Sequence, residues 1–251
     1  MASYDAVFWR RVIARSGTRP LMGTLYRIVE NQEQKVTVPL VDDLDEHEVL
    51  EQLIEGSKPA VAPELRRFDY LLRAPWRYPP LPWGSRFGSR WEPGIFYGAL
   101  SEEALLAEAA YYRLVFLDGM ETPFADRVMS QHTRFEARYQ SDAGRRLDEA
   151  PFARHERVLR HPAEYGPCQT LGTLLRAAGT HAFTYVSARA TGRELNIALL
   201  RPQALRSRRH LRPVAGLCET RLDGVRFRFG GRLSWFPREQ FLVEGALPRP
   251  A

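Results

Sequence analysis

Glu108 is the residue whose surroundings in the sequence most clearly indicate a functional role. If residues 101–115 form a helix, positions three and four residues away share its face. Those positions are all uncharged: Ala104, Leu105, Tyr111 and Tyr112. A carboxylate at the centre of an apolar face is either buried against a partner or lines a cleft. Glu108 is therefore a candidate site residue, and the alternative is a structural ion pair with an arginine.

Residues 86–91, Arg-Phe-Gly-Ser-Arg-Trp, form a second candidate feature. The guanidinium groups of Arg86 and Arg90 can each make two parallel hydrogen bonds to phosphate oxygens. Gly88 allows the backbone to approach a ligand closely, because it has no side chain. The segment predicts an anion-binding loop, although a loop that carries arginines can also simply face solvent.

The composition favours a folded protein with an anionic partner. The chain has 251 residues, 44% of them hydrophobic, which is enough to bury a core. Its formal net charge is +6, and Lys35 and Lys58 are the only lysines. A basic protein suits a nucleic acid, a phosphate-bearing small molecule or an acidic protein. The alternative explanation for the many arginines is the base composition of the genome.

Several classes of protein are not indicated by the sequence. Cys168 and Cys218 are far apart and lack CxxC spacing, so neither zinc nor a disulfide framework is predicted. The six histidines show no metal-ligand spacing either. No GxGxxG or P-loop motif is present. No apolar run resembles a signal peptide or a membrane span, so we expect a cytoplasmic protein without membrane association.

The first part of the chain is predicted to be an arm. Residues 4–15 and 45–54 have helical spacing, and residues 35–41 favour a strand. We place this N-terminal arm at residues 1–65, and the main domain at 66–251. The arm could serve self-association or the docking of a partner.

The main domain is predicted to be of the α+β class, with many short strands. Residues 68–72 and 95–97 are strand candidates, and Ser101 can cap a helix that runs to about residue 115. A helix over 170–178 should precede strands at 182–187 and 195–200. Asp223-Gly224, between two alternating segments, indicates a hairpin. No linker forces a further domain boundary.

In combination these segments resemble the RES family. Residues 86–97 match its arginine–tryptophan loop and the tyrosine strand that follows, and residues 98–108 match its helix with an essential glutamate. The other matching segments are Tyr70–Arg73, Cys168–Gly172, Val186–Ala188 and Glu194–Asn196. The resemblance covers residues 66–202. Departures are Glu92, Ser89 and Val186, where the family commonly has asparagine, glycine and proline.

The resemblance implies a fold similar to ADP-ribosyltransferase toxins, with a split sheet, and an activity on NAD. Family members hydrolyse NAD, split it with phosphate, or pass its ADP-ribose to a protein, and an antitoxin partner typically inhibits them. By the same resemblance, Glu108 would stabilise positive charge on the ribose. Arg73 and Arg90 would bind the pyrophosphate, with Arg86 in reserve.

Three further residues receive roles from the resemblance. Tyr97 would stack on nicotinamide, Ser187 would hydrogen-bond the amide or the ribose, and Gln169 would orient a neighbour. The alternatives are that Tyr97 is a core aromatic residue and that Ser187 only caps a turn.

Two other functions compete with NAD cleavage. The basic run at residues 206–212 would suit a nucleic-acid-binding protein or a nuclease, but no recognised motif and no convincing cluster of acids accompany it. We therefore expect no direct nucleic-acid binding. A binding module that has lost catalysis is the other alternative. The presence of Glu108, Arg73 and Arg90 argues against it.

Overall fold

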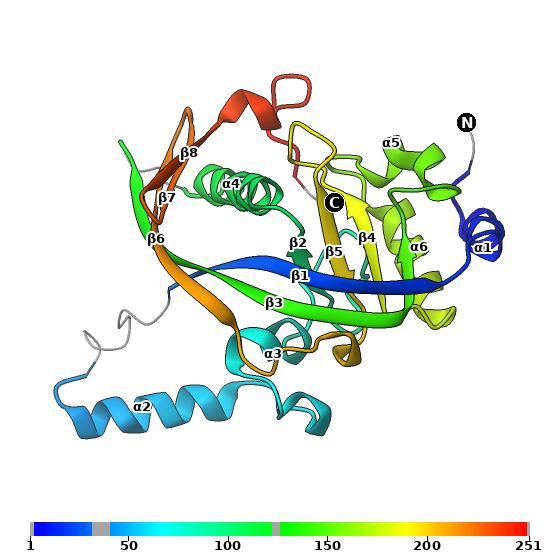
Figure 1. Cartoon of the computed structure of the whole chain (residues 1–251). Coiled ribbons are helices and arrows are strands. Elements are labelled where there is room, and N and C mark those ends of the chain that lie inside the picture. Colours follow the sequence, from blue (N-terminus) through cyan, green and yellow to red (C-terminus); the bar gives the residue numbers. More distant parts are fainter. Residues whose placement is uncertain (1–2, 32–40, 122–125, 250–251) are drawn as a thin grey trace.

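The computed structural model describes residues 3–31, 41–121 and 126–249, and it has the α+β class predicted from the sequence (Figure 1). The helices are α1 (Ala6–Ala14), α2 (Leu44–Ser57), α3 (Tyr70–Arg77), α4 (Glu102–Asp118), α5 (Glu156–Leu159) and α6 (Gly166–Ala177). The strands are β1 (Arg19–Glu30), β2 (Phe96–Ala99), β3 (Val128–Arg146), β4 (Ala182–Val186), β5 (Leu195–Leu199), β6 (Leu211–Arg221), β7 (Gly224–Phe229) and β8 (Arg232–Pro237).

All eight strands belong to one mixed sheet, in the order β1-β2-β5-β4-β3-β6-β7-β8. β3 is its organising strand, because one edge pairs antiparallel with β1 and the other pairs with β6 and then with β4. β1 also pairs with β2 at Tyr26 and Ala99. Five strands therefore form a closed circuit of pairings, and β6, β7 and β8 extend from it. Figure 1 shows β1 and β3 running side by side across the molecule.

The N-terminal region contributes more to the sheet than the sequence suggested. β1, which was not predicted, pairs with β3 from Arg19 to Glu30. The predicted helices at 4–15 and 45–54 are present as α1 and α2, and the strand predicted at 35–41 lies, apart from its last residue, outside the described residues. The boundary at residue 65 stays a prediction, but residues 19–30 are an integral part of the sheet.

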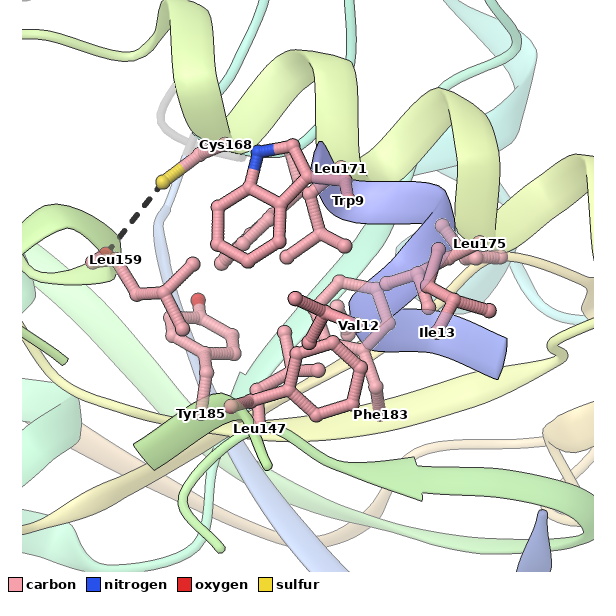
Figure 2. Packing of buried hydrophobic residues seen from close by; sticks show 14 of the residues in the cluster. Trp9, Val12, Ile13, Leu147, Leu159, Cys168, Leu171, Leu175, Phe183 and Tyr185 are labelled. Atoms are coloured by element: carbon pink, nitrogen blue, oxygen red, sulfur yellow. Dashed lines mark hydrogen bonds between the residues drawn. The ribbon is translucent and has the colours of Figure 1, made fainter. Parts of the chain in front are cut away.

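One hydrophobic core lies between α1, α6 and the outer face of β4. Figure 2 shows Trp9, Val12 and Ile13 of α1 among Leu171 and Leu175 of α6. The cluster also includes buried Phe183 and Tyr185 of β4 and Leu159 of α5. This packing fixes α1 and α6 against the sheet, and it places the end of β4 beside the candidate site.

A second core lies within the circuit of five strands. Every strand of the circuit contributes to it, and its members include Leu25, Phe96, Phe135, Ala182 and Ile197. Because side chains alternate between the two faces of a strand, Phe96 and Tyr97 of β2 point to opposite faces. Accordingly, Phe96 belongs to this core, whereas Tyr97 packs against the first one.

Helix α4 is the element that carries Glu108. Ser101 caps it as predicted, accepting a hydrogen bond from the backbone N–H of Ala104. Leu106, Ala110 and Leu114 pack against β6, β7 and β8 in a third core. Most faces of α4 are therefore buried, which restricts how Glu108 can move.

The strand expected at residues 68–72 is a helix instead. Asp69 caps α3 by accepting a hydrogen bond from the N–H of Leu72, and the helix continues to Arg77 despite Pro75. A short apolar run does not distinguish a strand from a helix by its pattern alone. The hairpin at Asp223-Gly224 is confirmed, and it joins β6 to β7.

Helix α2 lies at the periphery of the molecule in Figure 1, and an ion pair of 2.8 Å between Glu55 and Arg77 joins its last turn to α3. None of its residues is buried, and Leu44, Val49 and Leu53 are exposed. None of the helices within the described ranges is long and apolar enough to span a membrane.

Candidate functional site

The carboxylate of Glu108 is held by two hydrogen bonds from other elements. The hydroxyl of Ser187, just after β4, donates to Oε1 over 2.8 Å. The side-chain amide of Asn196 on β5 donates to the same oxygen over 3.0 Å. No carboxylate–arginine ion pair involving Glu108 occurs among the described residues. The alternative of a structural ion pair is therefore not what this geometry supports.

Ser187 links the carboxylate to a tight turn. Its side chain is completely buried, and its oxygen accepts hydrogen bonds from the backbone N–H groups of Arg189 and Ala190, each over 3.2 Å. With these acceptor positions occupied, the hydroxyl proton is directed to Glu108. Ser187 thus caps a turn and also contacts Glu108, so the two roles considered for it coexist.

Asn196 is a site residue to which the sequence analysis gave no role of its own. It is 3% exposed, and its Oδ1 atom has no hydrogen-bond partner among the described groups. A buried acceptor without a partner is costly, because it loses its hydrogen bonds to water. The sequence indicates residues 194–196 only as a segment that resembles the family. Its importance depends on the pairing of β5 with β4, which sets Asn196 opposite Tyr185.

The negative charge of Glu108 acts on the pKa values of two nearby tyrosines, Tyr111 and Tyr185. Burial raises the pKa of Tyr111 to about 12, and the negative charge of Glu108 adds to that shift. Burial also raises the pKa of Tyr185, with Glu108 as the next cause. These phenols stay protonated at neutral pH, so they add no negative charge beside Glu108.

Arg86 is built into the structure near this cluster. Its Nη1 donates to the carbonyls of Leu159 and His161, over 3.3 and 2.8 Å, and the guanidinium lies 4.5 Å from the ring centre of Tyr165. Burial would lower the pKa of Arg86, but Tyr165 and Glu108 outweigh it, and the pKa lies above its usual value. Arg86 is therefore a permanent positive charge close to Glu108.

The other end of the loop is open to solvent. Arg90 is exposed, and its guanidinium lies 4.1 Å from the ring centre of Trp91, which is itself 80% exposed. No ion pair or hydrogen bond of the Arg90 side chain occurs within the described ranges. Of the two arginines in this loop, Arg90 has the guanidinium that is free to contact a ligand.

Tyr97 and Gln169 fix the base of the loop. The hydroxyl of Tyr97 accepts a hydrogen bond from the N–H of Phe87 over 3.0 Å and lies 2.9 Å from Oγ of Ser85. Gln169 donates through Nε2 to the carbonyls of Trp83 and Ser85. Burial raises the pKa of Tyr97 to about 12. Tyr97 also lines a cavity of about 250 Å³. It is therefore both a packed aromatic residue and a residue with access to a cavity.

The structure does not bring Arg73 into contact with the Glu108 cluster. Its helix α3 packs on the Phe96 face of β2, where the rings of Trp76 and Phe96 stack with centres 5.2 Å apart. The Nε atom of Arg73 is buried there without a hydrogen-bond partner. The role of Arg73 in binding pyrophosphate stays a prediction.

Arg27 on β1 is a further residue that sequence reasoning missed. Its Nη1 donates to the carbonyl of Tyr97 over 2.7 Å, and its guanidinium lies 4.5 Å from the ring centre of Phe96. Burial lowers the pKa of Arg27 to about 10. The signal in the sequence was an arginine between Leu25 and Val29, on the face of a strand that is otherwise apolar.

The basic run at residues 206–212 is partly tied to neighbouring elements. The hydroxyl of Ser207 accepts a hydrogen bond from the N–H of Arg138, and the N–H of His210 donates to Asp69. In the described parts of the chain, no group of three or more His, Cys, Asp or Glu residues is placed to hold a metal ion.

Comparisons with known proteins identify the family to which the chain belongs. The family model described as the RES domain matches residues 61–223, well over half of the chain. No curated protein matches the sequence. A chain in the crystal structure of the M. tuberculosis MbcT–MbcA toxin–antitoxin complex aligns with 14% identity, covering 85% of this chain and 93% of that chain, at a TM-score of 0.47. The family match agrees with the resemblance in the sequence motifs, and the chain belongs to the RES domain family.

Proposed function

We propose that this chain is an enzyme that cleaves the bond between nicotinamide and ribose in NAD. The observation that carries the proposal is the carboxylate of Glu108, held through its Oε1 atom by Ser187 and Asn196. Membership of the RES domain family supports NAD as the substrate.

The geometry of Glu108 suits charge stabilisation. Breaking the bond to nicotinamide builds positive charge on the ribose, as glycoside cleavage does. Both hydrogen bonds end on Oε1, and none of the described side chains donates to Oε2. Oε2 can therefore face the ribose. A carboxylate that is already oriented needs little reorganisation when the charge develops, which lowers the barrier.

Other residues have properties that suit the rest of the dinucleotide. Arg90 offers a free planar guanidinium for the pyrophosphate, and Arg73 is a second proposed ligand. The ring of Tyr97 borders a cavity that can receive nicotinamide, while Gln169 keeps the adjoining loop in place. Arg86 uses Nη1 on backbone carbonyls, so we assign it mainly an electrostatic role.

The acceptor of the ADP-ribosyl group defines the type of reaction. Water would make the chain a glycohydrolase, phosphate would make it a phosphorylase, and a protein side chain would make it an ADP-ribosyltransferase. In each case the acceptor bonds to the ribose carbon that nicotinamide leaves. The test below separates the three.

The decisive experiment measures nicotinamide released from NAD by the purified protein, with and without phosphate. We expect release by the wild type and a loss of about 10²–10³-fold in Glu108→Ala. Glu103→Ala is the matched control, because Glu103 is an exposed acid on the same helix. Stimulation by phosphate indicates phosphorolysis, and a requirement for added protein indicates transfer. Equal release by the wild type and Glu108→Ala would contradict the proposal.

We further propose that the protein is the toxin of a toxin–antitoxin pair. Unrestrained cleavage of NAD would deplete a cell of an essential cofactor, so a neutralising protein partner is expected. Expression of the chain alone should arrest growth, whereas Glu108→Ala at the same protein level should not. Growth arrest by both proteins would contradict a role for NAD cleavage in toxicity.

A further inference from the structure

A cavity of about 470 Å³ borders the Ser187 turn at Ala188 and Arg189, and Glu108 is not among the residues that line it. Its walls are α5 and the residues that follow it, the turn at Ala188 and Arg189, and residues 240–243. The last of these segments follows residue 223, where the match to the RES domain ends. One wall of the cavity thus lies outside the part of the chain that matches the family model.

The cavity has more positive than negative charge. Arg157, Arg160 and Arg189 line it, together with the single carboxylate of Glu156. That carboxylate pairs with Arg160 over 3.2 Å and with Arg193, outside the cavity, over 2.7 Å. Within residues 3–31, 41–121 and 126–249, no carboxylate lies within ion-pair distance of Arg157 or Arg189. Two guanidinium groups therefore lack an anion.

Arg189 is held in place although its charge is not paired. It is 4% exposed, its Nη2 donates to the carbonyl of Pro162, and its guanidinium lies 3.4 Å from the ring centre of Tyr111. The side chain of Gln240 donates to the Arg189 carbonyl over 2.9 Å. A buried charge without a counter-ion is unfavourable, and a bound anion would relieve that cost.

Arg160 connects the cavity to the candidate site. Its Nε donates to the carbonyl of Ser187 over 2.9 Å, and Ser187 in turn donates to Glu108. Arg157, by contrast, is exposed at the cavity wall and has no hydrogen bond or ion pair within the described ranges. Arg160 has a structural role, whereas Arg157 is available to a ligand.

We propose that this cavity is an anion subsite that binds a phosphate group, in addition to the arginine loop. The proposal rests on the proposed cleavage of NAD. The phosphate could come from free inorganic phosphate or from a 2′-phosphate on the adenosine ribose of a dinucleotide. Both present oxygens that suit paired guanidinium groups.

The first test measures binding of inorganic phosphate by calorimetry, using Glu108→Ala as the background so that catalysis does not interfere. The double variant Glu108→Ala/Arg157→Gln should bind phosphate roughly three- to tenfold more weakly than Glu108→Ala, because one charged contact is lost at an exposed position. Arg154→Gln is the matched control, since Arg154 is exposed three residues away and does not line the cavity. It should leave the phosphate affinity unchanged.

The second test uses the phosphorylated dinucleotide as the source of phosphate. In the same background we expect tighter binding of NADP than of NAD if the subsite takes a 2′-phosphate, and Arg157→Gln should remove that preference. An effect of Arg157→Gln in either test supports the subsite and identifies the source. No effect of Arg157→Gln on phosphate or on the preference for NADP would overturn it. Binding that depends on Arg157, without any release of nicotinamide by the wild type, would refute the proposed function alone.

Discussion

The Glu108 cluster and the tip of the arginine loop differ in how firmly they are held. Glu108 lies on a packed helix and receives hydrogen bonds from a completely buried serine and a nearly buried asparagine. Arg90, at the loop tip, is exposed and rests only on the exposed ring of Trp91. The group proposed to act on the reacting bond is thus fixed before substrate arrives, whereas the group proposed to bind phosphate is free to adjust.

This difference separates two effects on activity. A preorganised charge lowers the barrier of the chemical step, so its loss should reduce kcat. A side chain that adjusts on binding contributes mainly to affinity, so its loss should raise KM. The first and last predictions below test this division between kcat and KM, and the two between them test how firmly the loop is held.

The largest effect is expected at Glu108 and its serine partner. Glu108→Gln should lower kcat for nicotinamide release by about 10²–10³-fold, and Ser187→Ala by about tenfold. Because Ser187 acts through Glu108, the double variant should be no slower than Glu108→Gln. Steady-state kinetics of the four proteins, with unfolding curves as the control for stability, measure this. Losses that multiply in the double variant would show that the two residues act independently.

The second prediction concerns stability at the two ends of the loop. Arg86→Met removes the hydrogen bonds to the carbonyls of Leu159 and His161, and the buried guanidinium, and should lower the free energy of unfolding by about 2–4 kcal/mol. Arg90→Met, the matched change at the exposed tip, should alter it by less than about 0.5 kcal/mol. Urea unfolding measures both. Equal changes would mean that the loop is not divided into a fixed and a free end.

The third prediction tests the hydroxyl of Tyr97, which joins the loop to the sheet. Tyr97→Phe removes the acceptor for the N–H of Phe87 and should cost about 1–2 kcal/mol of unfolding free energy. The wild type should also lose stability as pH rises from 10 to about 12, since the unfolded tyrosine releases its proton first.

Urea unfolding at neutral pH and above pH 10 checks this. Tyr97→Phe should lose less stability than the wild type between the two conditions, because the Phe variant has no proton to release at this position. An identical loss in both proteins would mean that the Tyr97 hydroxyl is not protected by burial.

The smallest effect is expected at the loop tip. Arg90→Gln should raise the KM for NAD roughly three- to tenfold and leave kcat within about twofold, because an exposed charge contributes modestly. Arg90→Lys, which keeps the charge but not the planar fork, should fall between. A fall in kcat at constant KM would place Arg90 at the reacting bond and remove the contrast with Glu108.

The parts of the fold that could be predicted have strong local patterns. The helix after Ser101 has a capping residue and a long apolar sequence, and the hairpin has Asp223-Gly224 between alternating segments. β1 could not be predicted in this way, because its partners on β3 lie more than 100 residues away. Residues 68–72 were predicted as a strand because an apolar run of five residues is too short to distinguish a strand from a helix. The signal for a helix was Asp69, which is of a residue type that commonly caps helices.

The site was predicted where a motif carried it and missed where distant elements meet. Glu108 and Ser187 come from family motifs, and the structure joins them by a hydrogen bond. Arg27 was missed because its neighbour Tyr97 lies 70 residues away in the sequence. The arginine-lined cavity beside Arg189 depends on residues 240–243, which lie beyond the family motifs in the sequence.

The long-range pairing of β1 has a consequence for synthesis of the protein. β1 leaves the ribosome before its partner β3 has been synthesised. Glu108 likewise precedes Ser187 by 79 residues and Asn196 by 88 residues. Such non-local contacts form slowly, because the intervening chain has to be closed into a loop first. A nascent chain that stops before residue 187 therefore carries the glutamate without either partner, and one that stops between residues 187 and 196 still lacks Asn196. The complete constellation is acquired only after β5 has been synthesised.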